Sequence, residues 1–371
     1  MPACHTSHDG ESRVSPSLKR SQHMEIQHSI LRSIRALFAT ALLCNLILAA
    51  GSAIAQQPYK VVDQWKLPDA GGWDYLLVDS PAHRLYITRG DHVDVLDTTA
   101  GKQVGTISGL HGTHGVALNP DGKIGYVSDG RGNAVVVFDR STFATVATIP
   151  AGTNPDAIIY EPTTKSVWAF NGRSNNITVI DAATQKVVAT IPVPGKPEFA
   201  VTDGKGTVFN NIEDKNEVIR IDANSKQITA TWSACESPSG LAFDIPGHRL
   251  FPVCDGKKMA VLDSNTGKIL ATPAIGDGPD AAGWSAKHKL AFASAGADGL
   301  LSVVDANSAD YKTIQSIPTK KSARTMAYDP AADRIYLASA DFGPRPAPTA
   351  DNPRPWPPMI PGSFTVIVVG R

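Results

Sequence analysis

The sequence predicts an all-β fold, a seven-bladed β-propeller, from one repeated motif, the spacing of that motif and the two ends of the chain. Six short apolar runs each end in an aspartate, and successive aspartates lie 41 or 42 residues apart. These residues are Asp97, Asp139, Asp181, Asp222, Asp263 and Asp305. A period of about 40 to 45 residues, with several short strands and turns in each unit, is typical of propeller blades.

Each repeat is predicted to contain four strands. The boundaries are clearest in the second repeat, where strands are expected at 114–118, 124–128, 134–138 and 144–149. Turns rich in Asn, Asp and Gly separate them. The aspartate after each third strand is interpreted as a turn former, because its carboxylate accepts hydrogen bonds from the backbone N–H groups that follow it.

The last repeat has only three strands of its own, at 324–328, 335–339 and 364–369. The fourth strand is predicted at 59–67, at the other end of the propeller. Pairing the first strand with the last closes the ring and removes the exposed sheet edges. We therefore expect one domain over 56–371, with a proline-rich insertion at about 342–362.

Residues 1–55 have the pattern of a secretory signal peptide. Arg32 and Arg35 precede an apolar core at 36–50, and small residues at 52–55 form a cleavage pattern. This core is short for a membrane span. A start at Met24 would give a signal of ordinary length. The expected location is the bacterial periplasm or the cell exterior, with no transmembrane segment in the mature chain.

Several segments of the second and third repeats match a known repeat pattern: YVSDG at 126–130, VVVFD at 135–139, VATIP at 146–150 and GTNPD at 152–156. In these segments the chain resembles the YVTN-type repeat proteins, including the YncE-like propellers of the periplasm. The resemblance extends over roughly 59–371. It implies a seven-bladed propeller that is exported from the cell.

Charge argues against a nucleic-acid partner. The whole chain has 35 basic and 35 acidic residues, and without 1–55 the net charge is about −2. Nucleic-acid affinity depends on basic side chains that neutralise phosphates, and this balance does not supply them. A monomer that binds a small molecule or a protein is expected.

Seven positions are predicted to meet at one mouth of the central channel. Each is the residue that opens the innermost strand of a blade, often after a proline. They are Asp74, His114, Asp156, Glu198, Ser239, Asp280 and Arg324. Crowded carboxylates raise one another's pKa values, as general bases require. The alternative interpretation is that a polar residue at this position belongs to the repeat and is simply solvated.

A divalent cation, Ca²⁺ or similar, is a possible cofactor at this mouth, as in propeller lactonases. The candidate ligands are His114, Asp156, Glu198 and Asp280, since hard cations prefer oxygen ligands and imidazole also binds metals. His111 could assist His114. The glycines at 112 and 115 argue instead for a flexible loop there.

Two tryptophans are candidate ligand contacts. Trp73 precedes Asp74, and Trp356 lies within the proline-rich insertion. A long loop without strands is uncommon unless it is a lid or a binding loop, and its prolines reduce the entropy lost on ordering. A lid or recognition loop is one interpretation of this insertion, and an insertion without a role is the other.

Cys235 and Cys254 remain after removal of 1–55. Their places in the fifth blade should make them neighbours, so a disulfide is one possibility and two free thiols the other. A c-type haem is excluded, since the chain lacks its attachment motif. Pyrroloquinoline quinone is not expected, because Val104 and Leu270 stand where its docking tryptophan would be.

The sequence therefore favours an exported binding module that uses one channel face. The alternative is a metal-dependent hydrolase of the lactonase type that uses the acids at the channel mouth. A third option is a subunit that docks a redox partner. No catalytic residue is assigned, because the sequence contains no Ser-His-Asp order, phosphate loop or zinc motif.

Overall fold

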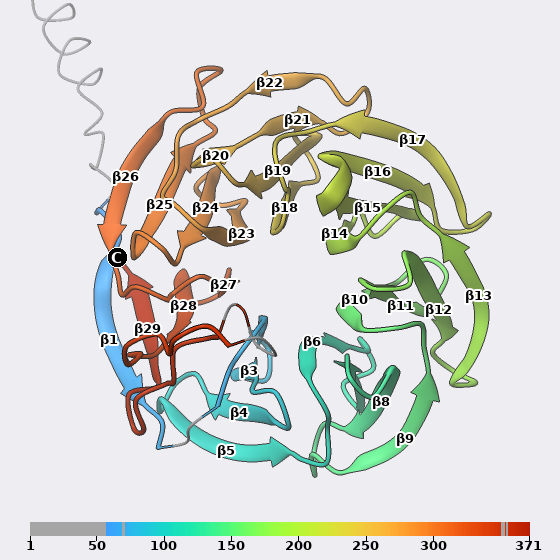
Figure 1. The fold of residues 1–371 in the computed structure, drawn as a ribbon. Helices are drawn as coiled ribbons and strands as arrows, with labels where there is room; N and C mark the ends of the chain where they lie inside the picture. The colour runs from blue at the N-terminus through green and yellow to red at the C-terminus, as the bar shows by residue number, and fades with distance from the viewer. Residues whose placement is uncertain (1–56, 69–70, 350–352, 354) are drawn as a thin grey trace, which may run out of the picture. The chain divides into compact units, whose positions relative to one another are not determined.

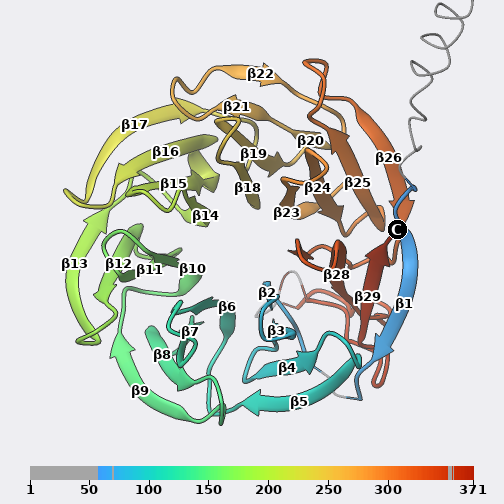
Figure 2. The ribbon, with the colours of Figure 1, turned by 180° about the vertical axis from the view of Figure 1, so that it is seen from behind.

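The computed structural model describes residues 57–68, 71–349, 353 and 355–371. Within them, seven antiparallel sheets surround a common axis, as Figures 1 and 2 show from opposite faces. The prediction of a seven-bladed β-propeller is confirmed. The predicted signal peptide and the alternative start at Met24 lie outside the described residues.

Each blade has four main strands, here called A to D from the axis outward. The A strands are β2 (Leu76–Asp79), β6 (Thr113–Leu118), β10 (Pro155–Glu161), β14 (Pro197–Thr202), β18 (Leu241–Asp244), β23 (Pro279–Ser285) and β27 (Met326–Asp329). The B strands are β3 (Arg84–Thr88), β7 (Ile124–Asp129), β11 (Ser166–Asn171), β15 (Thr207–Ile212), β19 (Arg249–Cys254), β24 (Leu290–Ala295) and β28 (Arg334–Ser339).

The C strands lie between the B strands and the rim. They are β4 (Val93–Asp97), β8 (Ala134–Asp139), β12 (Asn176–Asp181), β16 (Glu217–Asp222), β21 (Val261–Asp263), β25 (Leu300–Asp305) and β29 (Thr365–Gly370). The D strands form the rim and are β5 (Lys102–Ile107), β9 (Thr145–Pro150), β13 (Lys186–Pro192), β17 (Gln227–Ser233), β22 (Ile269–Ala271), β26 (Thr313–Pro318) and β1 (Lys60–Lys66). A short 3-10 helix at Glu213–Lys215 follows β15.

The ring closes through the first strand. β1 pairs antiparallel with β29, from Lys60 opposite Gly370 to Lys66 opposite Thr365. The strand predicted at 59–67 is therefore present and completes the seventh blade. The register shifts between Val61 and Asp63, so the pair contains a β-bulge.

Burial explains why the strands have different sequence patterns. The B and C strands are packed between two neighbouring blades, so both of their faces are apolar, and all six residues of β29 are buried. The D strands form the rim and alternate, as in β17, where every second residue is exposed. The core is consequently built between blades, and one cluster joins Trp65 and Tyr336 of the last blade to Leu85 of the first.

The fifth blade departs from this regularity for a local reason. Its third strand is split into β20 (Lys258–Met259) and β21, and both pair with β19. Pro252 stands opposite the break and has no N–H to offer, although its carbonyl accepts a 3.0 Å bond from the N–H of Ala260. A proline inside a sheet removes one ladder bond, so the strand is interrupted there.

The repeated aspartates form turns as predicted. Oδ1 of Asp97 accepts the N–H groups of Thr99 and Ala100 at 2.8 and 2.9 Å. The five equivalent carboxylates accept backbone N–H groups in the same way. In the part of the chain that the structure describes, no helix is both long and apolar enough to span a bilayer.

Candidate functional site

The seven predicted residues lie at the inner ends of the blades, on one face of the ring. His114, Asp156, Glu198 and Asp280 are each the second residue of an A strand. The other three precede their A strands by two positions. In the four strands the pairing register shifts at the predicted residue. Such a bulge re-aims a side chain, which turns these four groups away from the regular alternation.

Hydrogen bonds between neighbouring blades fix the backbone at these positions. Thr88 at the end of β3 donates from its hydroxyl to the carbonyl of His114 at 2.9 Å. Asn211 of β15 donates to the carbonyl of Ser239 at 2.7 Å, and Ser128 of β7 donates to that of Asp156 at 2.5 Å. A polar residue on each of these B strands therefore holds the site residue of the next blade.

Asp74, His114 and Asp156 form one cluster. Nδ1 of His114 lies 2.6 Å from Oδ2 of Asp74 and 3.7 Å from Oδ1 of Asp156. One ligand atom from each of the three lies within 4.8 Å of the others. The imidazole lies against Gly130, where a Cβ atom would come within 2.6 Å of the ring. A side chain larger than glycine at 130 would displace His114.

A second cluster contains Arg324, Asp280 and Ser239. Arg324 donates to Asp280 through Nη1 and to the carbonyl of Trp73 through Nη2, the latter at 3.1 Å. Its Nη1 is also 3.6 Å from Oδ1 of Asp74, so this arginine bridges the two clusters. Ser239 donates to Oδ1 of Asp280 at 2.6 Å.

The third cluster includes two residues that the sequence analysis missed. Nζ of Lys196 lies 2.6 Å from Oε1 of Glu198 and also pairs with Glu213. The hydroxyl of Tyr75 donates to Oε2 of Glu198 at 3.3 Å. The signals were present, since Lys196 lies two positions before Glu198 and Tyr75 follows Asp74. Neither falls on the repeated position from which the candidates were taken.

Burial and mutual charge shift the pKa values at this site. Burial raises the pKa of Asp156 to about 7, although the positive charge of His114 opposes the shift. Burial and the charge of Asp156 raise the pKa of Glu198 to about 8. For His114, burial disfavours the cation, but the bond to Asp74 and the charges of Asp156 and Asp74 outweigh it and raise the pKa to about 9. The pKa values of all three groups are therefore raised above their ordinary values.

The four predicted metal ligands fall into different clusters. His114 and Asp156 lie together with Asp74, whereas Asp280 pairs with Arg324 and Glu198 pairs with Lys196. His111 is placed apart from His114. Its side chain is 74% exposed, and its Nδ1 lies 3.5 Å from Oδ2 of Asp129.

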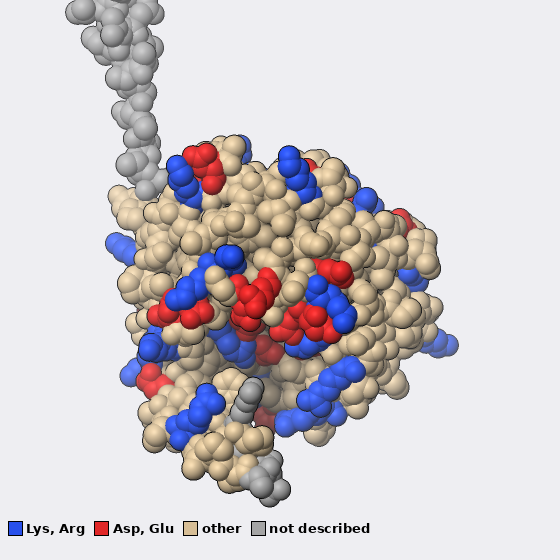
Figure 3. Space-filling view, turned by 45° about the horizontal axis from the view of Figure 1, so that its top comes forward, with Lys and Arg blue, Asp and Glu red and all other residues tan. Residues whose placement is uncertain are grey.

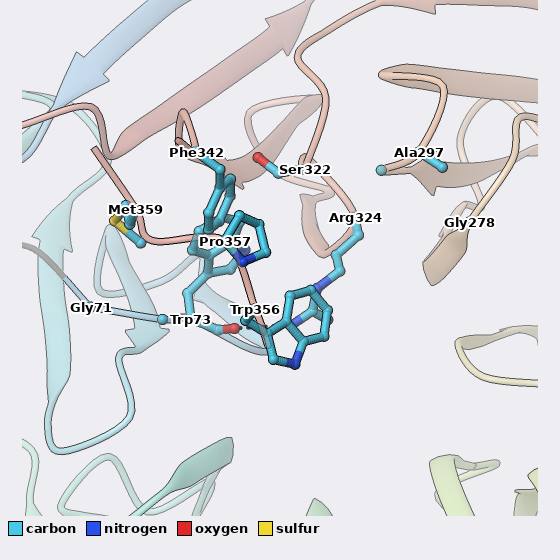
Figure 4. A pocket seen from close by; sticks show the side chains of 12 residues that line it. Gly71, Trp73, Gly278, Ala297, Ser322, Arg324, Phe342, Trp356, Pro357 and Met359 are labelled. Atoms are coloured by element: carbon cyan, nitrogen blue, oxygen red, sulfur yellow. Dashed lines mark hydrogen bonds between the residues drawn. The ribbon is translucent and has the colours of Figure 1, made fainter. Parts of the chain in front are cut away.

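A pocket of about 780 Å³ opens beside these clusters, between the first, sixth and seventh blades (Figure 4). Trp73 forms part of its wall and is buried, with its ring centroid 6.1 Å from that of Phe342 and 5.4 Å from that of Phe364. Trp356 also lines the pocket but is 83% exposed. Figure 3 shows acidic and basic side chains gathered around the hollow of this face.

The base of the proline-rich insertion is an ordered part of the pocket. Phe342 pairs with Met359 in an antiparallel bridge. Gly343 donates its N–H to the carbonyl of Pro358 at 2.8 Å, and Ile360 donates to that of Asp341 at 2.8 Å. The insertion connects β28 to β29 on the face that Figure 1 presents and Figure 2 turns away.

The two cysteines are bonded to each other. Cys235 and Cys254 form a disulfide with their Cα atoms 5.9 Å apart. Cys254 ends β19 and is fully buried. The bond joins the connection before β18 to the end of β19, close to Ser239 of the second cluster.

The fold and the site together define a seven-bladed β-propeller with ion-paired clusters at its axis and an adjoining pocket. No protein-family model and no curated protein sequence matches the chain. Among solved structures, a chain of hydrazine synthase from Kuenenia stuttgartiensis is similar, with a TM-score of 0.64 and 17% identity over 72% of this chain and 93% of that chain. U3-55K has a TM-score of 0.70 and 9% identity over 84% of this chain and 99% of that chain. Identities this low show a shared fold only.

Proposed function

We propose that this chain is an exported propeller of the YVTN type that binds a ligand or partner through the face carrying the pocket. The pocket carries the proposal. Its volume of about 780 Å³ lies within the roughly 300–1,000 Å³ of small-molecule sites, which are mainly apolar with a few placed polar groups. The lining, with Trp73, Phe342, Met359 and Arg324, has this composition.

The ion-paired clusters support a binding role more directly than a catalytic one. Arg324 is held by Asp280, His114 by Asp74 and Glu198 by Lys196. Groups tied to each other in this way are pre-organised, so little ordering entropy is lost when a ligand contacts them. We therefore place the ligand in the pocket beside the axial clusters, where Arg324 is the cluster residue that lines the wall.

The test compares the intact chain with a variant in which 345–357, including the pocket-lining Trp356 and Pro357, is replaced by a short Gly-Ser linker. The bridge between Phe342 and Met359 is kept, so the base of the loop is unchanged. A small-molecule library is screened by thermal shift on both proteins, and hits should raise the Tm of the intact chain alone, because a ligand that binds the native state stabilises it. Hits that shift both proteins equally, or an intact chain without hits, would count against the proposal.

Export is tested separately. The signal pattern at 1–55 and the resemblance of the repeats to exported propellers support it. Expression of the full chain in a bacterium, followed by fractionation and N-terminal sequencing, should recover a periplasmic or secreted protein that begins at Gln56. A cytoplasmic protein with an intact N-terminus would contradict export.

A metal-dependent hydrolase of the lactonase type is the second candidate, favoured by the cluster of Asp74, His114 and Asp156. The imidazole atom that would bind the metal is hydrogen-bonded to Asp74, and the high pKa of His114 means that a proton must leave first. If this function is correct, at least one of Ca²⁺, Mg²⁺, Mn²⁺ and Zn²⁺ should raise the Tm in a thermal melt. The protein with that ion should also hydrolyse lactones in an activity assay. No specific contact within the described residues favours a redox-partner role.

A further inference from the structure

We infer that the pocket takes an amphipathic organic anion, a compound with a flat aromatic body and one carboxylate. The inference deepens the proposed binding function and rests on it. It follows from what the pocket wall offers: several apolar surfaces, one exposed indole and a single charged group.

The wall is shaped for an apolar body. Trp73, Phe342, Pro357 and Met359 contribute ring faces and a thioether, and Figure 4 shows them grouped on one side of the pocket. Trp73 and Phe342 pack against each other, so this part of the wall is preformed. Aromatic and methionine side chains contact flat ligands well, because rings stack and a thioether adapts to their shape.

Trp356, which precedes Pro357 in the proline-rich insertion, supplies another aromatic surface. It is the most exposed large apolar residue of the described chain, at 83%, yet it borders the pocket. Leaving an indole in water is unfavourable by the area it exposes. A ligand that covers this ring would recover that free energy, so Trp356 is well placed to close over an aromatic body.

Arg324 determines the preferred charge. It is the single charged side chain among the described residues that line the pocket, and 39% of it is exposed. Its guanidinium donates one N–H to Asp280 and one to the carbonyl of Trp73. A guanidinium has five N–H donors, so three have no hydrogen-bond acceptor among the described residues. Arginine binds carboxylates through paired N–H groups, which fits a ligand carboxylate.

The same arginine is held firmly at the wall. Gly296 lies against it, and a Cβ atom at that glycine would come within 2.7 Å of the Cβ of Arg324. The neighbouring carboxylates of Asp74 and Asp280 are not part of the lining. Asp74 is paired with His114, while Asp280 accepts hydrogen bonds from Ser239 and Arg324, so the remaining N–H groups of Arg324 are the donors that a ligand carboxylate would meet.

The probes are three compounds with one ring system: 2-naphthylacetate, 2-naphthylacetamide and 2-(2-naphthyl)ethylamine. They carry a negative, a neutral and a positive group, and isothermal titration calorimetry of the full propeller measures their affinities. The acid should bind about tenfold more tightly than the amide, because charge-assisted hydrogen bonds are about twice as strong as neutral ones. The amine should bind most weakly.

Variants locate the binding site. Trp356→Ala should weaken binding of the acid about tenfold, the loss expected for one stacking contact. Ile360→Ala is the matched control, since Ile360 is an exposed apolar residue of the same loop that does not line the pocket. Arg324→Lys keeps the charge beside Asp280 but loses the paired N–H groups of the guanidinium. It should therefore reduce the preference for the acid over the amide. Circular dichroism confirms that each variant is folded.

The outcomes separate the two proposals. Equal affinities for the acid and the amide would overturn the anion inference and leave the binding function in place. If neither Trp356→Ala nor Arg324→Lys changes the affinities, the ligand binds outside the pocket. That result would count against both the anion inference and the proposed binding function. If none of the three compounds binds at millimolar concentration, the anion inference fails, and the library screen still tests the binding function by itself.

Discussion

Tyr59 donates a 2.5 Å hydrogen bond from its hydroxyl to Oδ1 of Asp333, although 274 positions separate the two residues. Asp333 also accepts the hydroxyl of Tyr328 at 3.1 Å and lies 2.9 Å from Nε2 of His288. Arg371 approaches it to 3.7 Å through Nε. One carboxylate thus gathers the first and last segments of the propeller, and it accounts for ring closure beyond the backbone pairing of β1 with β29.

This clasp predicts the effect of Tyr59→Phe. The change removes one hydrogen bond to a charged acceptor and nothing else, so the free energy of unfolding should fall by about 1.5–3 kcal/mol. Urea unfolding followed by fluorescence measures it. Tyr160→Phe is the control, because Tyr160 is a partly buried tyrosine whose hydroxyl has no hydrogen bond among the described residues, whereas Tyr59 is buried. Equal losses of free energy of unfolding in the two variants would show that the hydrogen bond between Tyr59 and Asp333 contributes nothing specific to stability.

Stability should decline as pH rises from 5 to 9. The pKa values of Asp156 and Glu198 are raised by burial to about 7 and about 8, so the folded state holds their protons more tightly than the unfolded state does. Such carboxyls cost stability progressively above their ordinary pKa near 4. The stabilisation from charged His114 is complete below pH 6.5 and is lost as pH rises through about 9. All three contributions have the same sign.

The measurement is the Tm at several pH values for the intact chain and for Asp156→Asn. The variant cannot ionise at 156, so its Tm should fall less between pH 5 and 8. Asp139→Asn is the control, because hydrogen bonds from Ser141 and Thr142 lower the pKa of Asp139 to about 2, outside this range. An intact chain with a flat or rising Tm over this range would contradict the assignment.

Removal of the disulfide should destabilise the fold without changing it. Cys235 and Cys254 are 19 positions apart, and closing a loop of this length is worth roughly 3 kcal/mol in the chain-entropy model. The variant with both cysteines changed to alanine should lose about that much in chemical unfolding, and reductant should no longer affect its midpoint. If reductant also leaves the midpoint of the intact chain unchanged, the bond does not contribute to stability.

The blades could be predicted from the sequence because the residues of their strands are both periodic and buried. Each repeat has the same four-strand pattern, and the last repeat lacks its fourth strand. The sequence therefore predicted that β1, at the start of the domain, pairs with β29 at its end. It did not indicate how the axial side chains pair. Lys196 lies in a connection outside the repeated position, and the contact of Trp73 with Phe342 joins the first blade to an insertion. Contacts of this kind depend on three-dimensional packing, which no local pattern encodes.

A buried ion pair between Arg89 and Asp94 supports the wall of the pocket. The side chain of Arg89 is fully buried, and its Nη1 lies 2.8 Å from Oδ2 of Asp94, whose side chain is 1% exposed. The guanidinium carbon lies 3.6 Å from the ring centroid of Phe364, and the same group donates to the carbonyls of Gly71 and Gly72 at the pocket edge. Arg89 therefore links the core of the ring to the wall of the pocket.

Arg89→Met should lower the free energy of unfolding by about 3–5 kcal/mol at pH 8, because it leaves the charge of Asp94 buried without its partner. The loss should be smaller at pH 5, since Nε2 of His92 lies 3.4 Å from Asp94 and the pKa of His92 is raised by its bond to that carboxylate. Arg84→Met is the control, because its pair with Asp97 is partly exposed and should cost less than about 1 kcal/mol. Urea unfolding of the intact chain and both variants at pH 5 and pH 8 gives the loss in free energy of unfolding for each variant at each pH. Similar losses for Arg89→Met and Arg84→Met would show that burial does not set the strength of the Arg89–Asp94 pair.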